Sequence, residues 1–537
     1  MIKDKVYIPL SLFFLTFVAV FSIACSQDSS VEIQTSIATT EATTDSTAEA
    51  TADSTAEATA EPVERVLKVA IPGDLLSETS TKILFEEIFL HKLYVGLTRF
   101  DPAGRLWPQM IVAIPSIENE GISTDGLTYT FLLNRDLKWS NEEPITAQQI
   151  LDTLISYDSV KEERPQLLEL FSKIDLTQST VIDDRTLVIK LRKSSPEFLT
   201  LSSLLPFFPV RSGSTDEGTF FLSNGPFQID YWSNNRISLI PNEVWEDPIG
   251  NISAHEIERL EFVGFESFTE AKEALSNGEI DVLNLTVSQA LEILTVPSGS
   301  AISVKPRHIT YGVFVNSQSL PFSAVESRQA LALGLDKQQL LGSLSDEIQR
   351  GYISTDSWIP PGIFGNDNSA GVALSASEEL VTDYWARGLK SRVVSIELLY
   401  SSENSLHVEL ATELQKLWEE KLPVQVILRS EQAEEYFADL KTGNYEFAIG
   451  GWQADYRHAS NWLLPFASDS DNNFLSLTDE KYNAFLENNE YADAHNYLIE
   501  QSVVIPMLNP VSLALVRSES VEPLSTMFDF QGAWTFD

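Results

Sequence analysis

Apolar side chains follow strand-like and helix-like spacings in turn along most of the chain after residue 65. Runs typical of strands occur at 66–71, 127–133, 186–191, 237–240, 280–285 and 393–400, and a helical pattern occurs at 269–275. Leucines at helical spacing from Leu406 to Leu417 are followed by Val424, Val426 and Leu428, which alternate as in a strand. The strand at 393–400, this helix and the strand after it predict a β-α-β unit. The pattern as a whole predicts an α/β protein.

One region places an apolar run directly before charged and aromatic side chains. Residues 446–450 are predicted to end a buried strand, and Gly451 and Trp452 to begin a loop that carries Asp455 and Tyr456. Because α/β proteins bind ligands at loops that follow strand ends, this loop is a candidate binding site. The alternative is a structural role, in which Asp455 caps the following turn and Trp452 packs in the core.

The N-terminus has the pattern of an export signal. Lys3 and Lys5 precede a mostly apolar run from Val6 to Ala24, which Cys25 follows. The sequence Ser-Ile-Ala-Cys at 22–25 resembles a bacterial lipobox, so residues 1–24 are predicted to be a lipoprotein signal peptide and Cys25 the lipidated residue. Cys25 is the only cysteine and therefore cannot form a disulfide within the chain. The alternative is a retained transmembrane helix with an incidental cysteine.

Residues 25–65, which begin with Cys25, are predicted to form a disordered tether. Their composition is dominated by Thr, Ala, Ser and acidic residues, and the octapeptide DSTAEATA occurs at 45–52 and again at 53–60. So few large apolar residues cannot bury enough surface to offset the entropy lost on ordering. A flexible coil of this length would hold the folded part on the order of 30 Å from a membrane.

Charge and length limit the partners and the architecture. The chain has 36 Lys+Arg against 78 Asp+Glu, a net charge of −42, which repels nucleic acids and anionic membrane surfaces. Contact with a membrane is therefore expected through the lipid anchor only. Residues 66–537 exceed the roughly 250–300 residues at which a single core stops growing, so at least two lobes are expected.

The motifs that mark common enzymes are absent from the sequence. Its six histidines form no HExxH motif and no pair at metal-ligand spacing, and neither a phosphate-binding P-loop nor a G-x-S-x-G elbow occurs. The sequence therefore predicts no catalytic residues, no metal, no cofactor and no enzymatic activity. Acidic residues are abundant enough that a glycosidase-like pair stays open as an alternative.

Six motifs occur in an order that is typical of one family. They are LYVGLTRFD at 93–101, DGLTYTF at 125–131, NGPF at 224–227, the segment 311–336 that ends in RQALALGLD, PPG at 360–362 and WQADY at 452–456. Together they resemble the ABC transporter extracellular solute-binding proteins of family 5, which include oligopeptide- and dipeptide-binding lipoproteins. Several are also good structural signals: Asn224-Gly225 suits a tight turn, and Asp336 suits a helix cap.

The resemblance implies a two-lobed, periplasmic-binding-protein-like type II fold with an extra α/β domain and a hinge between the lobes. Lobe I is expected to be discontinuous, formed by 66–96, 224–305 and 503–537. The extra domain is expected at 97–223 and lobe II at 306–502.

The resemblance also implies a function. It predicts a monomeric, extracytoplasmic receptor, at the outer face of the cytoplasmic membrane or in the periplasm. The receptor would capture an oligopeptide by hinge closure and deliver it to the permease and ATPase of an ABC importer. The alternatives are a dipeptide, an oligosaccharide or a metal chelate as ligand, a receptor that senses a peptide pheromone, or a secreted, lipid-anchored hydrolase.

Residue by residue, the resemblance places the family's ammonium-binding aspartate at Asp455. Further candidate ligand contacts are Trp452, Tyr456, Trp358, Tyr311 and Asn316. Many family members have a proline soon after this motif, where the present chain has Arg457-His458-Ala459-Ser460, so the loop is expected to follow a different path. No cation aligns with a family position that would bind the peptide carboxylate.

Overall fold

The computed structural model describes residues 66–72, 90–100, 106–161, 170–195, 198–209, 222–233, 235–246, 257–293, 295–361, 363, 378–388, 395–454, 458–470 and 472–517. The predicted signal peptide and tether lie outside these ranges, and so do Cys25, Asp455 and Tyr456. Within the ranges, none of the helices combines the length and the apolar character that a membrane span requires.

Strands and helices alternate as the sequence pattern predicts. The strands are β1 (Val66–Pro72), β2 (Thr98–Phe100), β3 (Leu106–Pro108), β4 (Thr128–Leu132), β5 (Thr180–Asp183), β6 (Thr186–Lys190), β7 (Phe227–Ser233), β8 (Arg236–Pro241), β9 (Arg259–Phe265), β10 (Val282–Leu285), β11 (Ser300–Pro306), β12 (Ile309–Val315), β13 (Tyr352–Ser354), β14 (Ser395–Ser401), β15 (Gln425–Glu431), β16 (Phe447–Gln453) and β17 (Val504–Arg517). The α-helices are α2 (Leu90–Leu93), α3 (Ala147–Ser159), α5 (Phe198–Leu201), α6 (Phe268–Ser276), α7 (Val287–Leu291), α8 (Val325–Leu333), α9 (Lys337–Ser343), α10 (Asp346–Gly351), α11 (Glu378–Gly388), α12 (Ser405–Lys421), α13 (Ala433–Thr442), α14 (Ser460–Leu463), α15 (Glu480–Glu487) and α16 (Tyr491–Glu500). The described residues also include two 3₁₀ helices, η5 (Leu205–Phe207) and η7 (Leu464–Phe466).

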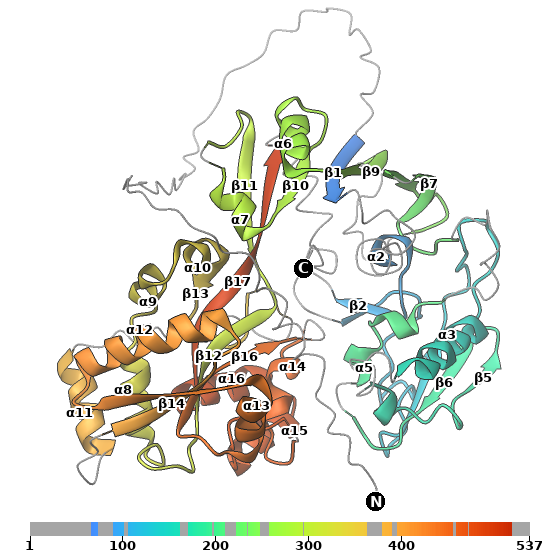
Figure 1. The fold of residues 1–537 in the computed structure, drawn as a ribbon. Helices are drawn as coiled ribbons and strands as arrows, with labels where there is room; N and C mark the ends of the chain where they lie inside the picture. The colour runs from blue at the N-terminus through green and yellow to red at the C-terminus, as the bar shows by residue number, and fades with distance from the viewer. Residues whose placement is uncertain are drawn as a thin grey trace, which may run out of the picture.

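A 12-stranded sheet runs through two halves of the molecule. Its order is β15-β14-β16-β12-β17-β10-β1-β9-β8-β7, and β11 and β13 also pair with β17. The first part of β17 pairs with β12 and β13, and its last part, from Val511 to Arg517, pairs with β10 and β11. We call the half with β1 and β7–β11 lobe I and the half with β12–β16 lobe II. Figure 1 shows β17, in red, running from one half to the other.

A second segment crosses between the lobes beside β17. Residues 307–308 join β11 of lobe I to β12 of lobe II, and the backbone N–H of Arg307 donates a hydrogen bond of 2.8 Å to the carbonyl of Pro510 in β17. Pro306, directly before this link, is the register partner of Val511. The two lobes are therefore connected by neighbouring segments that are hydrogen-bonded to each other where they cross.

Lobe II contains the predicted β-α-β unit. Strands β14 and β15 are parallel, in register from Ser395–Gln425 to Ser401–Glu431, and α12 connects them. The leucines at helical spacing, from Leu406 to Leu417, are buried on the face of α12 that packs against the sheet. The prediction is confirmed, because two parallel neighbouring strands are joined by a helix whose apolar stripe is buried.

Alternate residues of β12 point into different cores. Val313 and Val315 join a core that includes α8, α11 and α12, whereas Phe314 joins a core with α14, α15 and α16. Successive side chains of a strand point to opposite faces, so lobe II has helices over both faces of its sheet. Figure 1 shows the helices of lobe II on both sides of these strands.

The region between β2 and η5 forms its own small sheet, with order β4-β6-β5, but shares a core with lobe I. Leu67 and Val69 of β1 belong to the same cluster of buried residues as Phe131 of β4 and Leu154 of α3. The predicted boundaries, with lobe I at 66–96, 224–305 and 503–537, the extra domain at 97–223 and lobe II at 306–502, stay predictions.

Two of the sequence motifs contact each other. The side chain of Asn224 accepts a hydrogen bond of 3.1 Å from the N–H of Val95 and donates one of 3.0 Å to its carbonyl. At Gly225 a side-chain Cβ would lie 2.8 Å from the carbonyl carbon of Leu93, so the chain can pass there only without a side chain. The LYVGL and NGPF motifs therefore hold two distant parts of the chain together.

One predicted boundary is wrong. Gly451 and Trp452 belong to β16, which continues to Gln453, because β12 pairs with β16 along the whole of this stretch. At Gly451 a Cβ would lie 2.9 Å from the ring of Tyr311, its register partner in β12. The strand can continue because glycine leaves room for this ring.

Candidate functional site

A small pocket opens in lobe II where strands β14 and β16 end. The two strands are parallel, so their carboxyl ends meet at the same edge of the sheet, and α12 begins directly after β14. This is where open α/β sheets bind their ligands. The cavity has a volume of about 60 Å³, and all the residues that line it belong to lobe II. This volume is smaller than the roughly 300–1,000 Å³ of pockets that enclose a whole small-molecule ligand. The cavity is therefore about the size of a single side chain.

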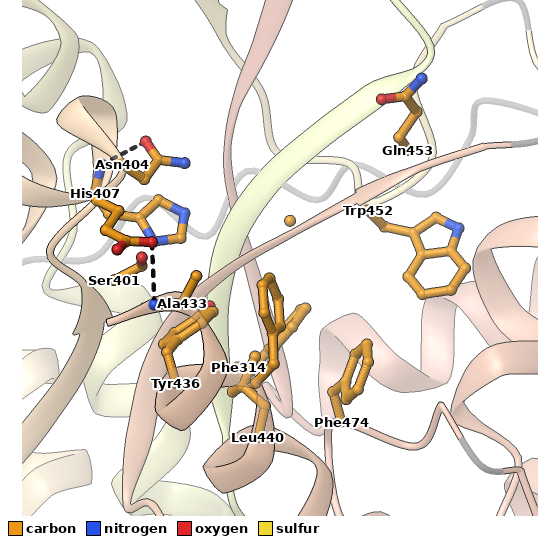
Figure 2. Close-up of a pocket in the computed structure, with 13 residues that line it drawn as sticks. Phe314, Ser401, Asn404, His407, Ala433, Tyr436, Leu440, Trp452, Gln453 and Phe474 are labelled. Carbon is orange, nitrogen blue, oxygen red and sulfur yellow. Dashed lines mark hydrogen bonds between the residues drawn. The ribbon is translucent and has the colours of Figure 1, made fainter. Parts of the chain in front are cut away.

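One side of the pocket is aromatic. It is formed by Phe314, Tyr436, Phe437, Trp452 and Phe474, which come from β12, α13, β16 and the segment before α15 (Figure 2). The hydroxyl of Tyr436 donates a hydrogen bond to the carbonyl of Ile449, and burial raises the pKa of this phenol. Phe314 packs edge-on against Phe466, with 5.8 Å between the ring centroids. These contacts fix the aromatic side before any ligand binds.

Two buried polar side chains, Asn404 and His407, also line the pocket. Asn404 caps α12, because its side-chain oxygen accepts a hydrogen bond of 3.2 Å from the N–H of His407. Within the described part of the chain, neither the Asn404 amide nitrogen nor either ring nitrogen of His407 has a hydrogen-bond partner. Asn404 is 9% and His407 3% exposed, and both point toward the cavity (Figure 2).

The histidine of this pocket is neutral at physiological pH. Burial lowers the pKa of His407 to about 3, and the ring packs edge-on against Tyr436 at 5.7 Å and Tyr311 at 6.2 Å. A neutral imidazole has one donor nitrogen and one acceptor nitrogen. Together, the amide nitrogen of Asn404 and the two ring nitrogens of His407 are therefore two donor nitrogens and one acceptor nitrogen, none of them positively charged.

The buried histidine makes a measurable prediction about acid stability. In the unfolded chain a histidine titrates near pH 6.5, whereas His407 in the folded protein titrates near 3. The unfolded state therefore binds the extra proton first, and the stability of the native protein falls as the pH drops from 6.5 toward 3. Between pH 7.5 and pH 5 this residue alone should cost on the order of 2 kcal/mol.

Urea denaturation of the native protein and of His407→Phe at both pH values measures this cost. We expect the variant to lose about 2 kcal/mol less than the native protein on acidification. All other titratable groups are common to the two proteins, so their contributions cancel in the comparison. Equal losses would show that His407 does not titrate with a lowered pKa.

The structure places the candidate site residues in different surroundings. Trp452 lines the pocket, and its indole N–H donates a hydrogen bond of 3.1 Å to the side-chain oxygen of Asn461. Tyr311 lies beside the pocket, in contact with His407. Asp455 and Tyr456 lie outside the described residues, although the described part of β16 ends only two residues before Asp455.

The other two candidates have structural contacts. Trp358 is fully buried, and its indole N–H donates a hydrogen bond of 3.3 Å to the carbonyl of Trp462. Asn316 donates hydrogen bonds to the carbonyls of Gly443 and Tyr445, at 2.9 and 3.0 Å. These contacts give both residues a role in holding lobe II together, and contact with a ligand stays a prediction for each.

Sequence reasoning missed the residues that form most of the pocket. In the sequence His407 is one member of a helix and Asn404 a plausible helix cap, while Tyr436 and Phe474 lie far from both. The one available signal was a cap residue directly after a strand in a β-α-β unit, which marks a ligand-binding edge of a sheet. Among the described residues, no group of His, Cys, Asp and Glu could hold a metal ion.

This chain is a two-lobed α/β protein whose lobes are joined by paired segments and whose pocket lies at a strand-end edge of the sheet. This architecture is that of the binding proteins that close on a solute. The sequence profile of the bacterial extracellular solute-binding proteins, family 5 Middle, matches residues 115–474. The chain belongs to this family. The resemblance noted from the six motifs is thereby confirmed.

Comparison with individual proteins agrees with this assignment. The oligopeptide-binding protein OppA of Bacillus subtilis is 23% identical over 415 residues, covering 72% of this chain and 74% of that protein. The probable deoxycholate-binding periplasmic protein YgiS of Escherichia coli K12 is 25% identical over 450 residues, covering 77% and 80%.

Solved structures confirm the predicted fold class. The periplasmic murein tripeptide binding protein MppA, in an unliganded open form, matches with a TM-score of 0.70 at 19% identity over 87% of this chain and 96% of that one. HbpA2 from Haemophilus parasuis matches with a TM-score of 0.64 at 18% identity, over 85% and 96%. This chain therefore has the two-lobed, periplasmic-binding-protein-like type II α/β fold.

Proposed function

We propose that this protein is an extracytoplasmic receptor that captures peptides and delivers them to the permease and ATPase of an ABC importer. The observation that carries the proposal is the side-chain-sized pocket at the end of β16, which lies two residues before Asp455 in the sequence. Membership of an extracellular solute-binding family supports the location, and relatives named for peptides support the ligand. The family is one of binding proteins, and we propose that the chain has no enzymatic activity and needs no cofactor.

Capture by closure of the lobes agrees with how they are connected. A ligand that contacts both lobes binds the closed state more tightly than the open one and so shifts the equilibrium toward closure. The paired segments at Arg307 and Pro510 are where such a motion would be taken up. In the proposed complex an extended peptide pairs through its main chain, and side chains enter pockets such as the one in lobe II.

The carboxylate of Asp455 is proposed to bind the peptide's terminal ammonium group. A charge-assisted hydrogen bond of this kind gains strength when closure excludes water. Trp452, which lines the pocket three residues earlier, and Tyr456 are proposed to flank the ammonium. Tyr311 is proposed to support the pocket through His407.

The N-terminal segments are proposed to attach this receptor to the cell. Cleavage before Cys25 and lipidation of its thiol would leave residues 25–65 as a tether between membrane and receptor. We propose a monomer that contacts the membrane through this lipid alone, since a net charge of −42 opposes adsorption to anionic lipid.

Calorimetric titration tests the proposed function and the role of Asp455 together. The chain from residue 26 onward is unfolded and refolded to remove carried ligand, then titrated with tri- to pentapeptides, free or N-acetylated. We expect acetylation and Asp455→Ala each to weaken binding by more than tenfold, about 1.4 kcal/mol. Because both changes remove the same contact, combining them should add little further loss.

Asp493→Ala provides a matched control, since this aspartate is exposed in the first turn of α16. The affinity of the Asp493→Ala variant for peptides should equal that of the native protein. Equal binding of free and acetylated peptides would contradict the role of Asp455. Binding of deoxycholate, a sugar or a metal chelate in place of any peptide would contradict the proposed ligand while leaving the family assignment intact.

A further inference from the structure

The pocket in lobe II combines an aromatic wall with a negative charge. Five of its lining residues are aromatic, and Leu440 adds to this apolar surface (Figure 2). Glu403 lines the same cavity and is exposed to solvent. Among the described residues that line it there is no Lys or Arg, and burial keeps His407 uncharged at neutral pH. A group that enters the cavity therefore meets aromatic rings and one carboxylate.

The carboxylate of Glu403 has capacity to bind a further group. One of its oxygens accepts a hydrogen bond of 3.3 Å from the backbone N–H of Ala433, at the start of α13. A carboxylate has two oxygens and about four acceptor positions, so this bond leaves room for others. In contrast, the amide nitrogen of Asn404 and the ring nitrogens of His407 are buried, so a ligand does not reach them. Glu403 is therefore the charged group that a ligand in this cavity can meet.

Acidic side chains also dominate the surroundings of the pocket. Arg429 of β15 already pairs with three carboxylates, at 2.8, 3.2 and 2.6 Å, those of Glu397, Glu431 and Asp439. Glu431 is the register partner of Ser401, which lines the pocket. Burial raises the pKa of Glu431, and the neighbouring Asp439 raises it further. This edge of lobe II therefore attracts a positive charge and repels a negative one.

The cavity suits the stem and the head of a basic side chain. A volume of about 60 Å³ is room for about four to six water molecules, and so for about as many heavy atoms. Lysine, with a four-carbon stem and an ammonium group, has about this many. The stem can pack against Phe437 and Trp452, and aromatic rings attract a cation that lies over them. A basic side chain therefore fits the cavity in size and in charge, whereas Glu403 would repel an acidic one.

We propose that this pocket is a side-chain subsite for a basic residue, lysine or arginine, of the bound peptide. The stem lies against the aromatic side chains, and the cationic head lies beside the carboxylate of Glu403. The proposal rests on the proposed function, because it specifies one side chain of the peptide ligand. Two carboxylates then have different roles, since Asp455 is proposed for the terminal ammonium and Glu403 for a side chain.

A guest series in a host peptide measures the selectivity. Tetra-alanine is the host, and Lys, Arg, norleucine, Gln or Glu replaces each alanine in turn; the chain from residue 26 onward, refolded without ligand, is titrated with every peptide. Norleucine has the stem of lysine without its ammonium, so the comparison isolates the charge. We expect one position at which Lys or Arg binds at least about fivefold more tightly than norleucine, Gln and Glu. The general attraction of a net charge of −42 for cations acts at every position alike.

Two variants assign the selectivity to the pocket. Glu403→Gln removes the charge but keeps an oxygen that can accept from the N–H of Ala433. It should reduce the preference for Lys over norleucine at that position to less than about twofold, while affinity for tetra-alanine stays within twofold. Glu420→Gln is the matched control, because this glutamate is exposed near the other end of α12 and the variant loses the same charge. It should leave the preference unchanged.

The possible outcomes separate this proposal from the proposed function. Binding of the host peptide without a gain from Lys or Arg, or with the same gain at every position, overturns the basic subsite alone. Equal binding of Lys and norleucine overturns it as well, since the pocket would then select an apolar side chain. A preference that persists in Glu403→Gln places the selectivity elsewhere and overturns the assignment to this pocket. If no peptide binds at all, the proposed function fails and the subsite fails with it.

Discussion

Trp418→Ala should lower the free energy of unfolding of lobe II by about 3–5 kcal/mol. The indole projects from α12, is fully buried and packs edge-on against Phe447 of β16, with 5.4 Å between ring centroids. Its N–H donates a hydrogen bond of 3.0 Å to the carbonyl of Leu331 in α8. The substitution therefore opens a large cavity between helix and sheet and also leaves a buried carbonyl without its partner.

Urea denaturation followed by circular dichroism measures this loss, and Trp418→Phe separates its two parts. Phenylalanine keeps most of the packing but has no N–H, so we expect it to cost only about 1–2 kcal/mol. A loss below about 1 kcal/mol for Trp418→Ala would mean that α12 and α8 do not share this core.

Gly312→Val should destabilise the protein by about 3 kcal/mol, because the added side chain has no room between two strands. A Cβ at this position would lie 2.6 Å from the carbonyl oxygen of Ile505 and 3.3 Å from the Cα of Pro506, both backbone atoms of β17. Backbone in the middle of a sheet cannot turn aside as a flexible side chain can. The register between β12 and β17 shifts just at this glycine, between Tyr311 and Gly312.

Gly342→Val is the matched control, since this glycine lies in α9 and a Cβ there meets nothing within 4 Å. Valine is a slightly better helix former than glycine, so the control should change stability by less than about 0.5 kcal/mol. The two variants are compared by urea denaturation under the same conditions. If Gly312→Val matched the control, the close approach of β12 and β17 would be disproved.

The fold could be predicted well wherever one periodicity continued over a whole element. The stripe of leucines from Leu406 to Leu417 specifies α12, and the alternation from Val424 to Leu428 specifies β15, because each spacing places apolar side chains on one face of only one type of element. The end of β16 could not be read in this manner. Gly451 looks like a loop residue in the sequence, and only its partner across the sheet, Tyr311, shows why a glycine stands within a strand.

The candidate site was predictable only in part. The position of Trp452 at a strand end is a local signal, and this residue does line the pocket. His407 gives no such signal, because its contact with Tyr436 depends on how α12 and α13 pack. Family resemblance alone also does not reveal structural contacts, such as the hydrogen bonds that Trp358 and Asn316 make within lobe II.

The path of the chain through the two lobes decides which of them is joined directly to the N-terminal segments. The chain leaves lobe I after β11, builds all of lobe II, and returns to lobe I along β17. Everything before Val66 is therefore covalently attached to lobe I, while lobe II is an insertion with both of its connections at the crossing. If Cys25 is anchored, lobe I is the fixed frame at the cell surface. The lobe that carries the pocket can then rotate without pulling on the anchor.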